Sequence, residues 1–180
     1  MVLVHLSQGN LDAPQCLIIL RVSVMTKYEW SVVCAEALCR EGIENFHPLE
    51  IADVGRETLH VTSRSRTRLK APELSLLPNA ITLCKLLCEL REALPVGPIL
   101  VNSWFRDFDY NYRIGGVSTS MHMTCGAADI TKVGWLPSEV AEWFDAHEES
   151  KQLGIGRYQM FTHIDIRGEL DRPAPARWSR

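Results

Sequence analysis

The chain has 180 residues, of which 46% are hydrophobic, and its formal net charge is −3 with a sequence pI near 6.1. This weak negative charge gives no electrostatic reason to expect nucleic acid or an anionic membrane as a partner. No stretch approaches the roughly 20 apolar residues that span a bilayer. We therefore expect one domain of ordinary size, acting as a monomer.

Residues 1–24 differ from the remainder of the chain. Their apolar run at 16–20 follows Asp12 and stops at Arg21, without a basic start or a clean cleavage site, so it does not predict a signal peptide. A more regular sequence begins at Met25. Our hypothesis is a disordered extension over 1–24, a natural start at Met25 and a single domain over 25–180.

The six cysteines do not have the spacing of a structural zinc ribbon, and no export signal accompanies them. We expect reduced thiols and synthesis in a reducing compartment, the cytoplasm.

The first half of the domain is predicted to be mainly helical. A helical period over 27–40 ends before Gly42. A short strand signal at 58–62 precedes a basic run at 64–70, which is typical of a solvated edge strand or loop. Asn79 is then expected to cap a helix over 80–94, whose inner stripe is Leu83, Leu87, Leu90 and Leu94.

The second half is predicted to alternate strands with one further helix. Pro95 ends the preceding helix, and 99–104 predicts a buried strand. Gly126 permits a turn into a strand from Ala127, which fades by Gly134. A helix from Pro137 to about Glu149, a turn or short strand at 154–158, a strand at 162–166 and an irregular tail with Trp178 docked on the body complete the prediction.

Three side chains in this half form a candidate metal site. His122 and Asp129 can meet across the turn at Gly126, while strand alternation puts His163 and Asp165 on one face. A catalytic zinc usually takes three protein ligands and leaves a fourth position open to water. We therefore predict one Zn²⁺ per chain, bound by His122, Asp129 and His163. Cys125, between two of these ligands, is a candidate to perturb or join the site.

The run SMHMTCGAAD from Ser120 to Asp129 resembles the SxHxxGxAxD signature of the zinc D-alanyl-D-alanine carboxypeptidase family. These LAS-type metallopeptidases share their metal-site architecture with lysostaphin-type peptidases and the hedgehog signalling domain. The upstream segment VNSWFRDFDYNYRIGG and the downstream segments GIGRY, FTHIDIRG and ARW are also similar to the family's motifs. The resemblance implies a zinc held by His122, Asp129 and His163 and hydrolysis of bacterial cell-wall peptides.

The resemblance also suggests roles for two polar residues. Arg106 matches an arginine of the family, so it is predicted to hold a substrate carboxylate or the developing oxyanion. Pairing with Asp107 or Asp109 is the alternative. Ser120 matches the signature serine and is expected to bind substrate or to orient His122.

Two positions depart from the family pattern. Cys125 replaces the signature glycine, and Met160 stands where many relatives carry an acidic general base. Asp165 is our candidate base on strand geometry. The alternative is that Asp165 orients a ligand histidine.

These observations predict an α+β domain whose small, mainly antiparallel sheet carries the metal site on one face and packs helices on the other. The predicted function is zinc-dependent hydrolysis of peptidoglycan stem peptides, as a D-Ala-D-Ala carboxypeptidase or an endopeptidase, at the cell wall after phage-type release. The alternative is a non-catalytic metal-binding or cell-wall-binding module that kept the fold.

Overall fold

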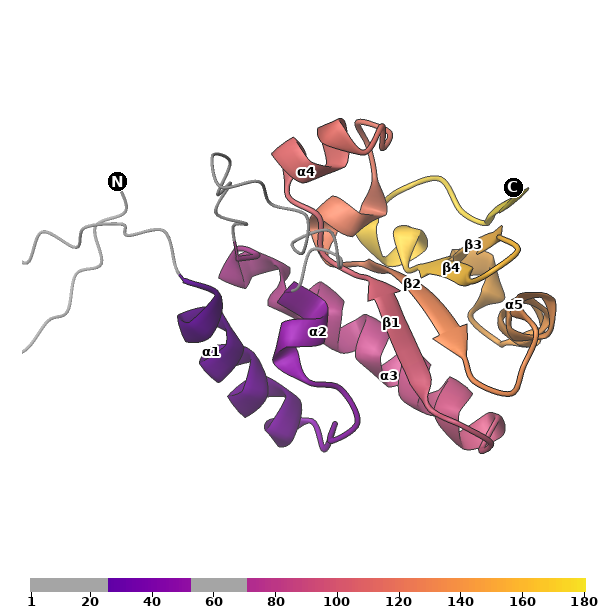
Figure 1. Ribbon diagram of the computed structural model, residues 1–180, viewed down its shortest axis with the longest axis horizontal. Coiled ribbons are helices and arrows are strands. Elements are labelled where there is room, and N and C mark those ends of the chain that lie inside the picture. Colours follow the sequence, from indigo (N-terminus) through magenta and orange to yellow (C-terminus); the bar gives the residue numbers. More distant parts are fainter. Residues whose placement is uncertain (1–25, 53–70) are drawn as a thin grey trace, which may run out of the picture.

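A computed structural model describes residues 26–52 and 71–180 of the chain (Figure 1). The predicted extension over 1–24, the strand signal at 58–62 and the basic run at 64–70 lie outside these ranges. Within them, no helix combines the length and the apolar composition needed to cross a membrane.

One sheet of five strands organises the domain, in the order β1-β2-β4-β3-β5. Neighbouring strands are antiparallel except β3 and β5, which are parallel. The predicted α+β class with a mainly antiparallel sheet is therefore confirmed. The strands are β1 (Ile99–Ser103), β2 (Ala127–Lys132), β3 (Gly154–Arg157), β4 (Thr162–Asp165) and β5 (Ala176–Ser179).

Helices lie behind and beside the sheet, with the long helix α3 crossing behind it, α2 against β1 and α5 beside β3 and β4 (Figure 1). The α-helices are α1 (Lys27–Arg40), α2 (Pro48–Ala52), α3 (Leu77–Ala93), α4 (Phe108–Arg113) and α5 (Pro137–Ala146). Short 3-10 turns are η2 (Leu74–Leu76), η3 (Met121–Thr124), η4 (Ser150–Gln152) and η5 (Arg167–Leu170).

Strand alternation separates the core from the polar face of the sheet. Ile130 of β2 and Ile164 of β4 are buried in one hydrophobic core with the leucine stripe of α3. Their neighbours Asp129 and His163 are cross-strand partners and point to the opposite face. This arrangement puts the candidate ligands on the face of the sheet that the core does not use.

The helix boundaries differ from two of the predictions. The predicted cap Asn79 lies inside α3, which begins at Leu77 because Pro78 occupies its first turn. The Asn79 amide instead donates a 2.9 Å hydrogen bond to the carbonyl of Thr124, tying α3 to η3. Helix α5 ends at Ala146 rather than near Glu149, because the next residue, His147, adopts an extended backbone.

Two strands also differ from prediction. The strand expected to be buried, β1, is an edge strand on which Leu100 is 46% exposed. The tail that was expected to be irregular forms β5, which pairs with the other edge of the sheet along β3. The tail thereby covers an edge that would otherwise present unpaired backbone groups.

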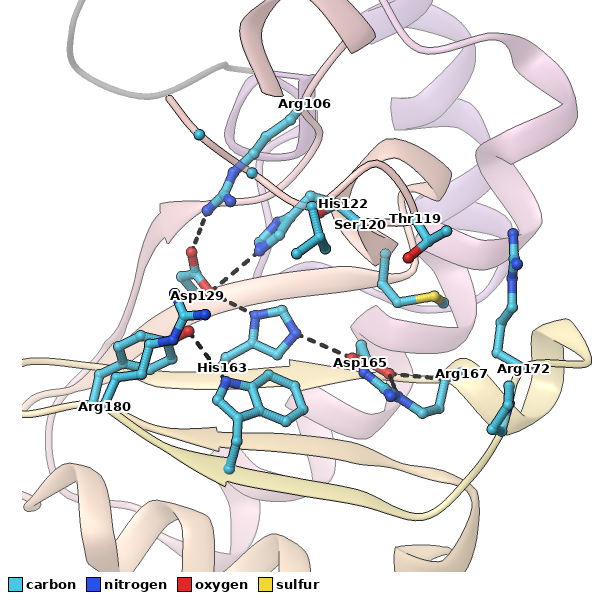
Figure 2. Close-up of a pocket in the computed structure, with 17 residues that line it drawn as sticks. Arg106, Thr119, Ser120, His122, Asp129, His163, Asp165, Arg167, Arg172 and Arg180 are labelled. Atoms are coloured by element: carbon cyan, nitrogen blue, oxygen red, sulfur yellow. Dashed lines mark hydrogen bonds and ion pairs between the residues drawn. The ribbon is translucent and has the colours of Figure 1, made fainter. Parts of the chain in front are cut away.

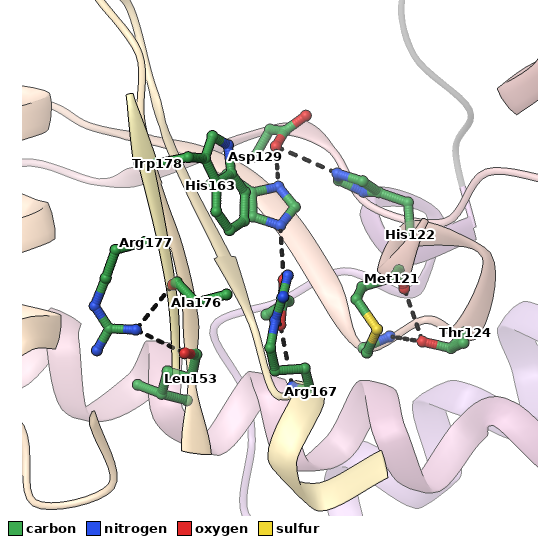
Figure 3. Close-up of polar contacts among 12 residues, drawn as sticks. Met121, His122, Thr124, Asp129, Leu153, His163, Arg167, Ala176, Arg177 and Trp178 are labelled. Atoms are coloured by element: carbon green, nitrogen blue, oxygen red, sulfur yellow. Dashed lines mark hydrogen bonds and ion pairs between the residues drawn. The ribbon is translucent and has the colours of Figure 1, made fainter. Parts of the chain in front are cut away.

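Arg177 fastens β5 to the domain. Its guanidinium donates to the carbonyl oxygens of Leu153 at 2.7 Å and Ser150 at 2.8 Å, and it pairs with Asp145 of α5 (Figure 3 shows the contact with Leu153). Arg157 of β3 binds the other carboxylate oxygen of Asp145. One carboxylate therefore joins a helix to two parallel strands.

We predict that Asp145→Asn lowers the free energy of unfolding by about 1 kcal/mol near pH 7. Burial alone would raise the pKa of Asp145, but hydrogen bonds from Arg177 and Arg157 outweigh it and hold that pKa below its ordinary value. Because the folded-state pKa is lowered, this stabilisation is present above about pH 4 and is lost as the pH falls through the folded-state pKa. Urea denaturation near pH 7 and pH 3 measures the difference.

The matched control is Glu142→Gln, an exposed acid on the same helix. It should change the unfolding free energy by no more than about 0.5 kcal/mol at either pH. An Asp145→Asn penalty that persists unchanged near pH 3 would contradict the proposed ion-pair origin.

Candidate metal centre

One residue with a left-handed backbone conformation directs the chain from η3 into β2. That residue is Cys125, with φ of 57°, rather than the predicted Gly126. Gly126 is needed for a close approach instead, since a Cβ there would lie 2.9 Å from Leu170 Cδ1. The Cys125 side chain is fully buried in the hydrophobic core, and burial raises its pKa well above the ordinary range. Cys125 therefore lies away from the metal group and does not join it.

The preceding turn holds the first candidate ligand, His122. Its Nδ1 lies 2.6 Å from the carbonyl oxygen of Trp104, an acceptor, so Nδ1 carries the proton. The other nitrogen, Nε2, is left unprotonated and lies 3.3 Å from Asp129 Oδ1. The geometry thus presents His122 Nε2 as a ligand atom.

The third candidate ligand, His163, presents Nδ1 to Asp129, whereas His122 presents Nε2. Its Nδ1 is 2.8 Å from Asp129 Oδ1, while its Nε2 is 3.1 Å from Asp165 Oδ2 (Figure 2). A proton on Nε2 donated to Asp165 leaves Nδ1 free to bind a metal. The two imidazoles therefore present Nε2 and Nδ1 to the same carboxylate oxygen.

This donor set fits a zinc ion. The ligand atoms of His122, Asp129 and His163 lie within 4.8 Å of one another, and all three residues are buried. Two ligands about 2.0–2.1 Å from a tetrahedral zinc would be roughly 3.3 Å apart. The separations of Asp129 Oδ1 from the two imidazole nitrogens, 3.3 and 2.8 Å, are close to that value. No other described His, Cys, Asp or Glu joins this group.

The protonation states also suit a cation. Burial lowers the pKa of His122, which keeps its imidazole neutral. Burial alone would raise the pKa of Asp129, but hydrogen bonds from His122 and His163 outweigh it, so the carboxylate stays ionised. Burial alone would lower the pKa of His163, whereas its hydrogen bonds to Asp129 and Asp165 raise it. Metal and proton therefore compete for His163.

Asp165 lies behind the imidazole of His163 rather than beside the ligand atoms. It is fully buried, and Arg167 binds both its oxygens, through Nε at 2.9 Å and Nη2 at 2.8 Å. Burial would raise the pKa of Asp165, but hydrogen bonds from His163 and Arg167 outweigh it and lower it to about 2. This placement favours the alternative that Asp165 orients a ligand histidine.

Arg106 approaches the candidate ligands from the opposite side. Its Nη2 pairs with Asp129 Oδ2, and its Nε donates a 2.9 Å hydrogen bond to Ser103 Oγ. The ion pair with Asp129 replaces the pairing with Asp107 or Asp109 that the sequence left open. Because Oδ1 of Asp129 faces the imidazoles, Arg106 holds the carboxylate in a one-oxygen binding mode.

A pocket of about 640 Å³ opens over the candidate ligands. Ser120 lines it and makes no side-chain hydrogen bond to His122, which leaves substrate binding as its predicted role. Met160, at the position where relatives carry an acid, is 77% exposed and is not among the lining residues. Within the described ranges, Asp129 and Asp165 are the only acids that line the pocket.

Two further residues complete the site: Arg167, for which the sequence suggested no role, and Trp178, which was predicted only to dock on the body of the domain. Arg167 binds Asp165, which in turn contacts Nε2 of His163 (Figure 2). Trp178 of β5 packs its ring 5.1 Å from that of His163, with the Arg167 guanidinium 5.3 Å from the indole centroid. The indole N–H donates to the Tyr158 hydroxyl at 3.1 Å. The sequence feature that could have pointed to a contact between Arg167 and Asp165 is their spacing of two residues.

Gly156 provides the space for this indole. A Cβ at Gly156 would lie 2.6 Å from Trp178 Cε2, so we predict that Gly156→Ala displaces the ring and lowers the unfolding free energy by about 1–3 kcal/mol. Thermal or urea unfolding of the metal-free protein measures the effect. In a Trp178→Ala background the same change should cost much less, since the clash has been removed. Equal penalties in both backgrounds would refute the contact.

A family model described as Peptidase M15 matches residues 52–165. The match includes all three candidate ligands and ends at Asp165, so β5 and Trp178 lie beyond it. No curated protein matches the chain.

Proposed function

Because this chain belongs to the peptidase M15 family, we propose that it is a zinc-dependent peptidase that hydrolyses peptidoglycan stem peptides, as a D-Ala-D-Ala carboxypeptidase or as an endopeptidase. The observation that carries the proposal is the buried convergence of His122, Asp129 and His163 within 4.8 Å, in one pocket. A zinc ion bound there lowers the pKa of a water in its open position and polarises a carbonyl oxygen.

The chain's own residues hold and orient the reacting groups. His122 Nε2, Asp129 Oδ1 and His163 Nδ1 are the proposed metal ligands. Asp165, fixed by Arg167, accepts the Nε2–H of His163 and so keeps Nδ1 directed at the metal. Arg106, beside Asp129, is close to the position where negative charge develops, and Ser120 lines the wall that a substrate would contact.

Peptide hydrolysis also requires a general base. A general base must reach the attacking water and accept its proton. The two acids that line the pocket within the described ranges are a proposed ligand and a carboxylate bound by Arg167. To accept a proton, Asp165 has to give up a contact with Arg167 or His163, and its pKa of about 2 makes it a weak base.

Because both acids that line the pocket within the described ranges are already engaged, a second candidate is also supported. It is a metal-binding or cell-wall-binding module without hydrolytic activity. A pocket that keeps three metal ligands but offers no unpaired carboxylate, within the described ranges, is what such a module would retain. Peptide binding without cleavage would be its expected behaviour.

Digestion of purified peptidoglycan by the zinc-loaded chain, with mass spectrometry of the released fragments, tests the two candidates. Release of free D-alanine indicates a carboxypeptidase, and release of peptide fragments cut within the stem indicates an endopeptidase. Intact peptidoglycan after incubation with a chain that carries one zinc would reject the peptidase and favour the binding module.

A further inference from the structure

The pocket is lined by more basic than acidic side chains, whereas the chain as a whole has a negative net charge. The chain has 22 acidic and 19 basic residues in total. The side chains that line the pocket include four arginines but only two aspartates, namely Arg106, Arg167, Arg172, Arg180, Asp129 and Asp165. Basic side chains are therefore concentrated at this one cavity, and a bound divalent metal would add further positive charge.

Two of these arginines already have acidic partners inside the site. Arg106 pairs with Asp129, and Arg167 pairs with Asp165. Arg172 and Arg180 are exposed, and neither side chain makes a hydrogen bond or ion pair with any described residue. Within the part of the chain that the structure describes, both guanidinium groups are therefore without an acidic side-chain partner and can bind a ligand in the pocket.

Backbone hydrogen bonds fix the main chain at both of these arginines. The N–H of Arg172 donates to the carbonyl of Arg167, and the N–H of Arg180 donates to the carbonyl of Arg157, each at 2.9 Å. Figure 2 shows Arg180 on the Asp129 side of the site and Arg172 beyond Arg167, with His163 and Asp165 between them. The two guanidinium groups therefore lie at different places along the pocket.

We infer that Arg172 and Arg180 bind carboxylate groups of the substrate, which is a peptide with at least two free carboxylates. A guanidinium matches a carboxylate with two parallel N–H donors, and a cavity with one sign of charge concentrates ligands of the opposite sign. A stem peptide meets this requirement, because a γ-linked D-glutamyl residue keeps its α-carboxylate in addition to the carboxylate at the C-terminus. The inference rests on the proposed function for the class of peptide, but its charge requirement can be measured by binding alone.

The test compares two peptides by isothermal titration calorimetry on the metal-free full-length chain. One is L-Ala-γ-D-Glu-L-Lys-D-Ala-D-Ala, and the other has both carboxylates replaced by carboxamides. Each lost charged contact costs roughly tenfold in affinity, so the wild type should bind the acid at least about tenfold more tightly. The double variant Arg172→Gln/Arg180→Gln should lose most of that preference.

The control is Arg40→Gln, which removes the same charge from an exposed site on α1 and should keep the full preference. Equal binding of the two peptides by the wild type would overturn the inference. So would a double variant whose preference falls less than about threefold. Because both replaced side chains are exposed, the double variant is expected to fold like the wild type.

Failure of the proposed function would be seen separately. If the zinc-loaded wild type leaves both peptides and purified peptidoglycan intact, the peptidase is rejected, while the calorimetric comparison still decides the role of the two arginines. If it cleaves the acid, KM for the acid should rise in the double variant with kcat nearly unchanged, because the lost contacts bind the ground state and the transition state alike.

Discussion

Asp129→Ala is expected to abolish both zinc binding and peptide hydrolysis. Asp129 Oδ1 lies 3.3 Å from His122 Nε2 and 2.8 Å from His163 Nδ1, and its Oδ2 pairs with Arg106. Losing a direct ligand should weaken zinc binding by more than the 10–100-fold typical of outer hydrogen-bond partners, and hydrolysis should fall to background. Zinc content by elemental analysis and digestion of peptidoglycan measure the two effects.

Loss of folding has to be separated from loss of metal. Removing the carboxylate leaves the partly buried Arg106 without its partner, which costs about 3–5 kcal/mol in buried pairs. Asp129→Asn keeps the shape of the side chain, so circular dichroism should show a folded protein that still lacks zinc. Asp109→Asn, on the exposed side of α4, is the matched control and should retain both properties. Full zinc content in a folded Asp129→Ala protein would refute the proposed centre.

Asp165→Asn separates the two roles that remain possible for this carboxylate. If Asp165 orients His163, zinc affinity should fall about 10–100-fold and most activity should return at saturating zinc. If Asp165 is the general base, zinc affinity should stay near that of the wild type while kcat falls about 10²–10⁴-fold. The contacts with Arg167 and His163 lead us to expect the first result.

Arg167→Gln provides an independent check on this expectation. The variant leaves Asp165 in place but removes the guanidinium that binds both its oxygens. If the chain from Arg167 to His163 positions the ligand, Arg167→Gln should lower zinc affinity in the same direction as Asp165→Asn. An unchanged zinc affinity in both variants, with a loss of kcat in Asp165→Asn alone, would assign Asp165 as the base.

The elements that sequence alone predicts well are those fixed by local patterns. Helix α1 follows the spacing of Trp30, Cys34 and Leu38, all of which are buried. Strand β5 could not be predicted in the same way, because its short segment follows a proline-rich stretch and pairs with β3, about 20 residues earlier in the chain. The contacts of Arg177 that hold it come from two earlier segments, α5 and the stretch from Ser150 to Leu153.

In the candidate site, too, local patterns predict some features, while contacts between separate segments determine others. The spacing of His122 and Asp129 with strand alternation at His163 predicts three residues that the structure brings together. The direction of the Asp165 carboxylate depends on hydrogen bonds from Arg167, the first residue of η5. The alternation of side chains along a strand cannot predict these contacts. Likewise, the left-handed conformation of Cys125 turns its thiol into the core, although its position between two ligands suggested the opposite.

The central claim is that His122, Asp129 and His163 bind one zinc ion. Crystals of the zinc-loaded chain, with an anomalous difference map at the zinc absorption edge, test it directly. We predict one peak per chain, about 2.0–2.2 Å from His122 Nε2, Asp129 Oδ1 and His163 Nδ1. A zinc peak at other residues, or a zinc-soaked crystal without a peak between these three atoms, would contradict the metal centre on which the proposed function rests.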